Sequence, residues 1–221
     1  MRLSFVVAAL AVIASPAMAA DYPYYQPPNF DFEEDRAAGG WTGQYLGITV
    51  GGLRPRIDVP GATVIEGNGI VGGVFAGVNF QQDNGLVLGA EADAEYAGFH
   101  GTGTCAVATW TCRGTLEYQG SLRGRVGFAV DAFHVYGTAG LAVAHIGGST
   151  TSPANAQFRD SDTFIGWTAG VGAEVAFSDA WFVRAEYRYT DYGSRDMTFD
   201  GAYPGVKATS HAVRAGLAYR F

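Results

Sequence analysis

The chain has 221 residues, of which 48% are hydrophobic, 14% aromatic and only 16% charged, and it contains 32 glycines. Charged residues make up about 25% of an ordinary soluble domain, so this composition indicates a protein whose outer surface does not all face water. The net charge of −7 argues against a nucleic-acid-binding protein, which needs a basic surface. Lys207 is the single lysine among 14 basic residues, whereas a soluble β protein normally scatters lysine and glutamate over its outward face.

The first residues form an export signal. Arg2 precedes an apolar run from Leu3 to Ala14, and Ala17-Met18-Ala19 has the small-x-small pattern of a signal-peptidase site. The run is shorter than the roughly 20 residues that span a bilayer, and no later stretch is long and apolar enough for a membrane helix. We therefore predict a signal peptide over residues 1–19, with cleavage after Ala19 or alternatively Ala20, and Sec-type export from the cytoplasm.

Residues 20–40 are rich in proline and acidic side chains, a composition that resists packing into a core. We expect a flexible periplasmic extension here. Tyr24 and Tyr25 leave a binding role for this segment open.

From Trp41 onward the chain divides into alternating segments of about ten residues, the length that a tilted membrane strand needs. The predicted strands cover residues 41–52, 70–82, 86–97, 116–130, 132–146, 163–177, 181–192 and 211–221. Three connections are tight turns, at residues 82–85, 130–132 and 178–180, and four are long, at 53–69, 98–115, 147–162 and 193–210. Short and long connections alternate, as in an outer-membrane barrel with periplasmic turns and extracellular loops.

Each predicted strand has one apolar and one polar face, since side chains alternate across a strand. The polar faces mix both charge signs with many glycines, which suits a narrow interior where guanidinium groups pair with carboxylates. Large aromatic residues of the apolar faces cluster beside the short turns, as in the aromatic girdle of a membrane interface. These membrane-interface aromatics are Phe80, Phe128, Phe133, Phe177, Trp181 and Phe221. The first strand fits least well, because Trp41 and Tyr45 share a face with Gly43 and Gly47.

Several short motifs occur in a fixed order along residues 41–221. They are Trp41-Thr-Gly-Gln-Tyr-Leu-Gly47, Gly72-Gly-Val-Phe-Ala-Gly-Val-Asn-Phe80, Gly89-Ala-Glu-Ala-Asp93, Gly120-Ser-Leu-Arg-Gly-Arg-Val-Gly127, Tyr136-Gly-Thr-Ala-Gly-Leu141, Ala185-Glu-Tyr-Arg-Tyr189 and the terminal Phe221. With them the chain resembles the small outer-membrane β-barrel proteins of Gram-negative bacteria, especially the alpha-proteobacterial RopB-like, porin-family surface antigens. The resemblance implies insertion by the outer-membrane assembly machinery through the strand Val213–Phe221, exposure at the cell surface, contact with lipopolysaccharide and no established enzymatic activity.

The predicted fold is thus an all-β, eight-stranded antiparallel transmembrane barrel over residues 41–221, with short periplasmic turns and four long extracellular loops. Side chains fill the interior of a barrel with eight strands. The charged residues expected inside are Glu91, Asp93, Glu95, Glu117, Arg123, Arg125, Glu174, Arg184, Glu186, Arg188, Arg214 and Arg220. Six acids against six arginines predict a neutralised ionic plug, in which each buried charge has a partner. The alternative is a narrow, low-conductance path that opens when the pairs rearrange.

Cys105 and Cys112 lie in one predicted external loop. An exported chain with one close pair of cysteines is expected to form a disulfide, and two sulfurs without nearby histidines make a poor zinc site. We predict a structural disulfide, no metal and no cofactor.

Catalysis is the third alternative, because some barrels of this size modify lipid A. His145 with Ser149, and Ser210 with His211, are near the predicted rim, but neither pair has a carboxylate at a fixed strand spacing. We expect no enzyme. The predicted function is a structural, surface-exposed barrel that supports envelope integrity, with adhesion or a host ligand on the loops left open. The basic loop residues that could meet lipopolysaccharide phosphates are Arg54, Arg56, Arg113, Arg159, Arg195 and Lys207.

Overall fold

The computed structural model describes residues 40–61, 63–105, 109–198 and 201–221. The predicted signal peptide and nearly all of the predicted extension lie outside these residues. The regular elements of the described part are strands: β1 (Gly43–Val59), β2 (Thr63–Glu66), β3 (Gly69–Gln81), β4 (Leu86–Thr104), β5 (Thr111–Val130), β6 (Phe133–Thr151), β7 (Gln157–Ala176), β8 (Trp181–Thr198) and β9 (Ala202–Arg220). Within the described ranges, the chain has no helix of the length and apolarity that a membrane crossing requires.

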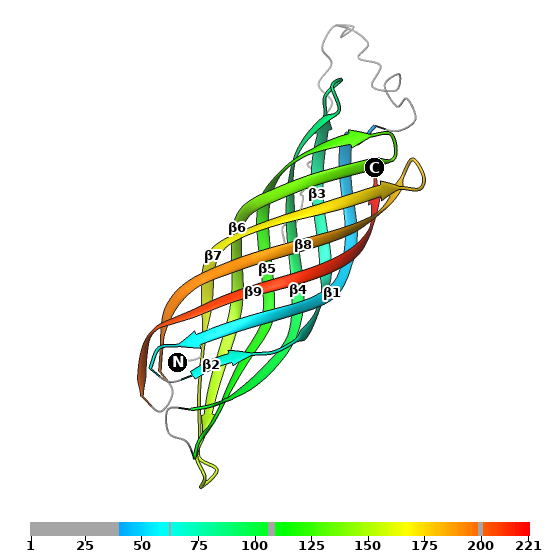
Figure 1. Cartoon of the computed structure of the whole chain (residues 1–221). Coiled ribbons are helices and arrows are strands. Elements are labelled where there is room, and N and C mark those ends of the chain that lie inside the picture. The colour runs from blue at the N-terminus through cyan, green and yellow to red at the C-terminus, as the bar shows by residue number, and fades with distance from the viewer. Residues whose placement is uncertain (1–39, 62, 106–108, 199–200) are drawn as a thin grey trace, which may run out of the picture. The chain divides into compact units, whose positions relative to one another are not determined.

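The strands form one closed antiparallel ring (Figure 1). Consecutive strands pair from β3 to β9, and β1 pairs with both β3 and β9, so the sheet has no open side. The short strand β2 continues the register of β3 against β1: Leu53 faces Gly69, and Arg56 faces Glu66. β2 and β3 therefore occupy one strand position that is interrupted at residues 67–68. In the described residues the ring has eight strand positions, and the predicted fold class is confirmed as a closed antiparallel β-barrel.

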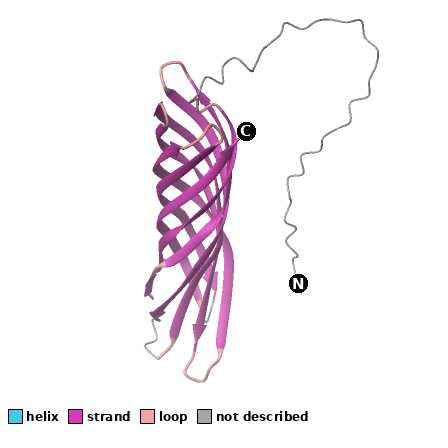
Figure 2. Cartoon of the chain, turned by 90° about the vertical axis from the view of Figure 1, so that its right-hand side faces the viewer, coloured by secondary structure: helices cyan, strands magenta, loops and turns pink. Residues whose placement is uncertain are grey.

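The two ends of the barrel differ in the way the strands are joined. Tight connections join β3 to β4, β5 to β6 and β7 to β8 at the end where Phe221 lies, which is uppermost in Figure 1. In the first of these turns Gly85 has a φ of +83°, a left-handed conformation that glycine adopts at no steric cost. Figure 2 shows long strands running from these turns toward the opposite end.

The prediction of four long loops was wrong. The strands extend deep into residues 53–69, 98–115, 147–162 and 193–210, and leave only short connections such as residues 152–156 between β6 and β7. The reason is a reversal of polarity along each strand. In β5, the outward residues Leu122, Val126 and Phe128 are exposed and apolar, whereas farther along the exposed residues are Thr111 and Arg113 and the buried one is Leu116.

A β-bulge marks this reversal on β5. The register with β6 shifts between Leu116 and Tyr118, so Glu117 has no partner across the ladder. A bulge inserts one extra residue and changes which face the following residues occupy. Strict alternation counted back from residue 130 therefore fails at Glu117, and the segment beyond it does not match the pattern of a membrane strand.

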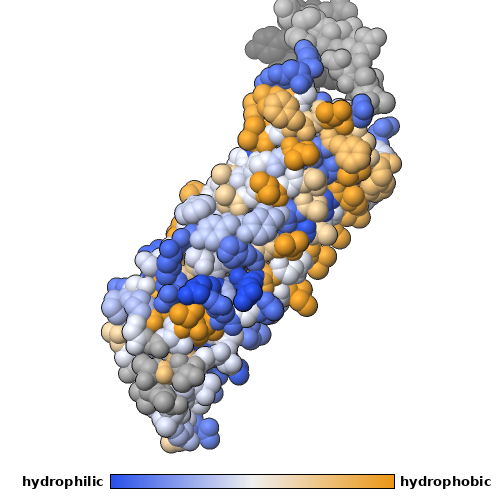
Figure 3. Space-filling model, viewed as in Figure 1, coloured by the Kyte–Doolittle hydropathy of each residue, from blue (hydrophilic) through white to orange (hydrophobic). Residues whose placement is uncertain are grey.

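The outward surface consequently has two zones. The zone next to the tight turns is apolar and includes Ile48, Val74, Leu141, Val171 and Val213, each more than half exposed. The zone at the β2 end is polar, and Figure 3 shows hydrophilic residues gathered over the lower part of the face that Figure 1 presents. An exposed apolar belt fits lipid, and the polar extension beyond it fits an aqueous or head-group medium.

Candidate functional site: the closed bore

An aromatic layer fills the bore at the turn end. Trp41, Tyr45, Phe75 and Phe182 are each 1–2% exposed and pack together, with Trp41 and Phe182 ring centroids 5.5 Å apart. The Trp41 indole Nε1 donates a hydrogen bond to the carbonyl oxygen of Asp131 in the turn after β5, at 3.3 Å. The mixed face of Trp41, Tyr45 and glycines in the predicted first strand is therefore the inward one.

Glycines make room for these rings. A Cβ placed on Gly77 would lie 2.3 Å from the Tyr45 hydroxyl, and a Cβ on Gly172 would lie 2.5 Å from the Tyr136 ring. Such separations are far inside van der Waals contact, so a narrow bore can hold large aromatic side chains only where the opposing residues lack a side chain.

A charge network fills the middle of the bore, with Glu91 of β4 at its centre. Arg184 of β8 donates to both carboxylate oxygens of Glu91, at 3.0 Å to Oε1 and 2.7 Å to Oε2. Arg125 pairs with Glu91 at 3.2 Å, Arg123 also donates to it, and the Tyr45 hydroxyl donates to it at 2.7 Å. Bidentate pairs of this kind are the strongest and most directional charge-assisted hydrogen bonds.

Glu174 of β7 forms the second centre. It accepts from Arg125 Nη2 at 2.8 Å and from Arg184 Nη2 at 2.7 Å, and its other oxygen lies 2.8 Å from His134 Nδ1. The Arg184 guanidinium also stacks on the Phe75 ring, 3.8 Å from its centroid. This stacking joins the charge network to the aromatic layer at the turn end.

Two more centres continue the network toward the β2 end. Glu186 accepts from Arg123 at 3.0 Å and from Arg188 Nη2 at 2.7 Å. Glu95 accepts from Arg214 through Nε and Nη2, both at 2.8 Å, and from the Gln119 amide at 2.6 Å. Asp93 connects these centres, because Arg123 and Arg188 each donate a hydrogen bond to it at 3.1 Å.

The structure brings ten of the twelve predicted interior residues into this network. These are Glu91, Asp93, Glu95, Arg123, Arg125, Glu174, Arg184, Glu186, Arg188 and Arg214. Five arginines face five carboxylates, so the paired set is neutral. Because a buried charge without a partner is very costly, this balance is what allows the charges to lie inside the barrel.

Two predicted members lie elsewhere. Glu117 occupies the β5 bulge and makes no ion pair in the described part of the chain. Arg220 lies at the turn-end rim, where its guanidinium donates to the carbonyl oxygen of Asp179 and to that of Gly40. The bulge accounts for the first error, and the position of Arg220 at the very end of β9, beyond the filled bore, accounts for the second.

Sequence reasoning missed the neutral members of the network. Tyr45, Tyr136, His134, Gln119 and Ser121 each bond to one of its carboxylates. Gln119 and Ser121 were on the predicted polar face of their strand. The position of Tyr45 on the glycine-bearing face of the first strand is the sequence feature that indicates its inward orientation.

A third layer, beyond the charges, is apolar. About half of the buried residues here come from the unpredicted strand extensions; the layer includes Leu53, Ile57, Phe99, Leu116, Ile146, Phe164 and Met197. The outer part of the bore is therefore filled like the core of a soluble β-barrel, with apolar side chains inside and polar ones outside.

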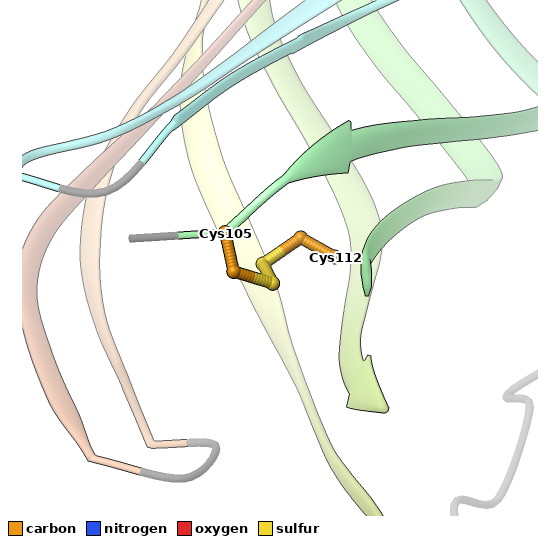
Figure 4. Close-up of a disulfide and its surroundings, with 2 residues drawn as sticks. All are labelled: Cys105 and Cys112. Carbon is orange, nitrogen blue, oxygen red and sulfur yellow. A yellow bond between two sulfur atoms is a disulfide. The ribbon is translucent and has the colours of Figure 1, made fainter. Parts of the chain in front are cut away.

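The predicted disulfide is present and belongs to this apolar layer. Cys105 follows β4 and Cys112 lies near the start of β5, and their Cα atoms are 5.3 Å apart (Figure 4). Both cysteines are buried, at 8% and 9% exposure, so the bridge packs into the core. It thus ties the ends of two neighbouring strands directly over the filled bore. The described residues contain no cluster of three or more histidine, cysteine or acidic side chains that could hold a metal ion.

The predicted membrane-interface aromatics point outward at the turn end. Phe80, Phe128, Phe133, Phe177 and Phe221 are 60–65% exposed and Trp181 is 41% exposed. A second group of outward aromatics, Tyr96, Tyr118, Trp167 and Tyr187, lies where the apolar zone ends. Two aromatic levels with an apolar belt between them match the two interfaces of a membrane.

A closed antiparallel ring with an apolar outer belt and a polar, charge-paired interior defines a transmembrane β-barrel of the bacterial outer membrane. The chain belongs to the outer membrane protein beta-barrel domain family, whose model matches residues 5–221.

Relatives of known name span nearly the whole chain. It is 35% identical to the 31 kDa outer-membrane immunogenic protein of Brucella melitensis, over 96% of each chain. It is 33% identical to the 25 kDa outer-membrane immunogenic protein of Brucella abortus, over 99% of this chain and 97% of the relative. It is also 33% identical to the 22 kDa outer membrane protein of Rhizobium leguminosarum bv. viciae, over 84% of this chain and 81% of that protein. The protein is a multi-pass β-barrel of the cell outer membrane.

Proposed function

We propose that this protein is a structural outer-membrane barrel, exposed at the cell surface, that supports the integrity of the envelope and does not conduct solutes. The observation that carries the proposal is the Arg184–Glu91 pair, which crosses the bore between an aromatic layer and an apolar layer. Opening a path would require separating several buried ion pairs and displacing packed apolar side chains. Each broken pair leaves an uncompensated buried charge, which makes the closed state strongly favoured.

A narrow channel is the second candidate. A small cavity within the charge network, lined by residues such as Thr49, Asp93, Arg188 and Arg214, supports it. This cavity lies between the aromatic and apolar layers, so conduction would need both of them to move. For that reason the closed barrel is the function that we propose.

We also propose that the barrel has no catalytic role. Of the rim histidines considered for lipid A chemistry, His211 places its Nδ1 2.7 Å from the Tyr187 hydroxyl, and its ring lies against Tyr189. A Ser-His-carboxylate arrangement needs a carboxylate that orients the imidazole, and here a phenol occupies that position. This contact supports a packing role for His211 beside Tyr187 in the second group of outward aromatics.

The proposed partners are the outer-membrane lipid and lipopolysaccharide around the barrel, and the outer-membrane assembly machinery at the C-terminal strand. The two Brucella relatives are called immunogenic, which supports a proposal that the β2 end faces the exterior of the cell. Adhesion to another cell or to a host surface through the hairpins at that end is an additional proposal.

A deletion strain tests the envelope function. We expect loss of the gene to sensitise cells to detergents and large antibiotics, and expect plasmid-borne wild-type protein to restore resistance. Uptake of small solutes, measured in the same strains, should be unchanged. A deletion strain with normal detergent resistance but reduced solute uptake would refute the structural role and favour the channel.

A further inference from the structure

The polar zone at the β2 end has two unlike sides. On the side formed by β8, β9, β1 and β2, most exposed cations are paired with acids: Arg56 with Glu66, and Lys207 with Asp191 at 3.1 Å. Arg54 lies 3.7 Å from the same Glu66. These groups largely satisfy each other. The exception is Arg195 of β8, which is exposed and makes no ion pair among the described residues.

The side formed by β4 to β7 has a different chemistry. One row of directly opposed residues runs across it: Thr102 on β4, Arg113 on β5, Ser149 on β6 and Arg159 on β7. Thr102, Arg113 and Arg159 are exposed and Ser149 is partly exposed. The adjacent rows add the hydroxyls of Thr111, Thr115, Ser161 and Thr163 to the same face. The result is an outward surface of hydroxyl groups with two guanidinium groups.

Neither arginine of this row is neutralised. Among the described residues, Arg113 makes no hydrogen bond or ion pair, and Arg159 donates to the neutral amide oxygen of Gln157 at 2.7 Å. Asp160 and Asp162 alternate with Arg159 along β7 and so lie on its opposite face, where Asp160 accepts from the Thr198 amide at 2.8 Å. The remaining carboxylate of this side, Glu117, is four residues from Arg113 along β5.

The spacing and depth of the row suggest its ligand. Arg113 and Arg159 are separated by one strand, which places their backbones about 10 Å apart. Arg113 is four ladder steps from Tyr118, a member of the second group of outward aromatics, and for a tilted strand it lies about 10 Å farther from the tight-turn end. The row lies on the outward face of the strands, so in the proposed orientation it would face the head groups of neighbouring lipids at this height.

We propose that the Arg113–Ser149–Arg159 row is a binding site for the phosphorylated sugar head group of an outer-leaflet glycolipid. The guanidinium groups would hold two phosphates of the head group, since arginine matches phosphate geometry through paired hydrogen bonds. The threonine and serine hydroxyls between and beside them would bond to sugar hydroxyls. This inference rests on the proposed exterior position of the β2 end, and it selects one side of the barrel over the other.

The test compares two double variants of the refolded full chain. Arg113→Gln with Arg159→Gln removes the unpaired cations, and Arg54→Gln with Arg56→Gln removes the same charge from the salt-bridged side. Binding is measured by co-sedimentation with vesicles that contain lipopolysaccharide, with the same lipopolysaccharide after enzymatic dephosphorylation, and with inorganic phosphate as a soluble competitor. Unheated gel mobility shows that each variant is folded.

We expect the Arg113/Arg159 variant to bind lipopolysaccharide vesicles about tenfold more weakly, which corresponds to about 1.4 kcal/mol. The Arg54/Arg56 variant should stay within about twofold of wild type, and dephosphorylation should bring wild type down to the level of the first variant. Equal losses in both variants would reduce the effect to general charge attraction and overturn the proposal. Full competition by inorganic phosphate, or preference for a soluble sulfated polysaccharide over lipopolysaccharide, would also overturn it. The deletion strain tests envelope support separately, so the two proposals can fail independently.

Discussion

The Arg184 guanidinium donates hydrogen bonds to both oxygens of the Glu91 carboxylate, at 3.0 and 2.7 Å, although 93 residues separate the two in sequence. Arg184 is on β8 and Glu91 on β4, and these strands lie opposite each other in the eight-position ring. The pair is therefore a strut across the full width of the bore. Arg188 of β8 and Asp93 of β4 form a second strut one level farther along, at 3.1 Å.

Replacing Glu91 with Gln is predicted to destabilise the barrel strongly. The amide keeps the shape of the side chain but removes the negative charge that Arg123, Arg125 and Arg184 share. Removing one partner of a buried ion pair typically costs about 3–5 kcal/mol, because the remaining charge is left uncompensated. Urea unfolding in lipid vesicles, followed by tryptophan fluorescence, measures the change in the free energy of unfolding.

Two variants serve as controls for Glu91. Glu66→Gln breaks an exposed pair on the outer surface, and such pairs contribute about 0–1 kcal/mol. Glu117→Gln changes an acid that the alternating pattern places in the bore but that the structure leaves in a bulge. Both should unfold like wild type. A loss for Glu117→Gln as large as that for Glu91→Gln would contradict the network described here.

The glycine at position 77 is predicted to be needed for the full stability of the barrel. An alanine Cβ there would meet the Tyr45 hydroxyl at 2.3 Å and the carbonyl oxygen of Ala90 at 2.6 Å. Overpacking of this kind costs about 1–3 kcal/mol, so Gly77→Ala should lower the folded fraction after refolding. Gly52→Ala is the matched control on the neighbouring strand, because nothing lies within 4 Å of its Cβ position. Equal refolding yields of the two variants would rule out this steric argument.

The parts of the fold that sequence could predict are those that depend on local alternation. The membrane stretches of the strands, the three tight turns and the charge-bearing faces follow from side-chain period two and turn residues. The half of the barrel at the β2 end was not predicted, because its polarity is reversed. Leu116 and Phe99 point inward there, whereas the membrane stretches of the same strands place charges inward. A bulge such as that at Glu117 depends on pairing with β6 across the ladder, and one strand read alone does not reveal it.

The composition of the site was only partly predictable for a related reason. Alternation assigns Arg184 and Glu91 to inward faces, but which acid meets which arginine depends on the closure of the ring. Tyr136 and His134 enter the network because each lies within reach of a carboxylate from another strand, Glu186 and Glu174. Such pairings need the three-dimensional register of opposing strands, which no local pattern contains.

Removing the disulfide is predicted to loosen the outer half of the barrel more than the membrane half. Closing a loop of about eight residues contributes roughly 2.5 kcal/mol in the chain-entropy model. In Cys105→Ala with Cys112→Ala, we expect faster protease cleavage between β4 and β5 and little change in the membrane strands, observed by limited proteolysis of vesicle-embedded protein. Thiol labelling of unreduced, denatured wild type should find no free cysteine. Substantial labelling would show that the bridge does not form.

Phe221→Ala is predicted to separate assembly from stability. The Phe221 ring is 65% exposed and touches Tyr219, while its backbone amide donates to the Gln44 carbonyl at 2.9 Å, a bond that alanine retains. The purified variant should therefore unfold within about 1 kcal/mol of wild type. In cells, we expect less protein in the outer membrane, because the terminal aromatic strand is the proposed recognition element for assembly. Unchanged outer-membrane levels, measured by membrane fractionation, would refute that role.

The most direct test of the closed bore is the conductance of the refolded protein in a planar lipid bilayer. The struts formed by Arg184 and Glu91, and by Arg188 and Asp93, predict a flat current trace at physiological salt across the usual range of voltage. Steady openings on the nanosiemens scale from pure, folded protein would contradict the account and establish the barrel as a channel.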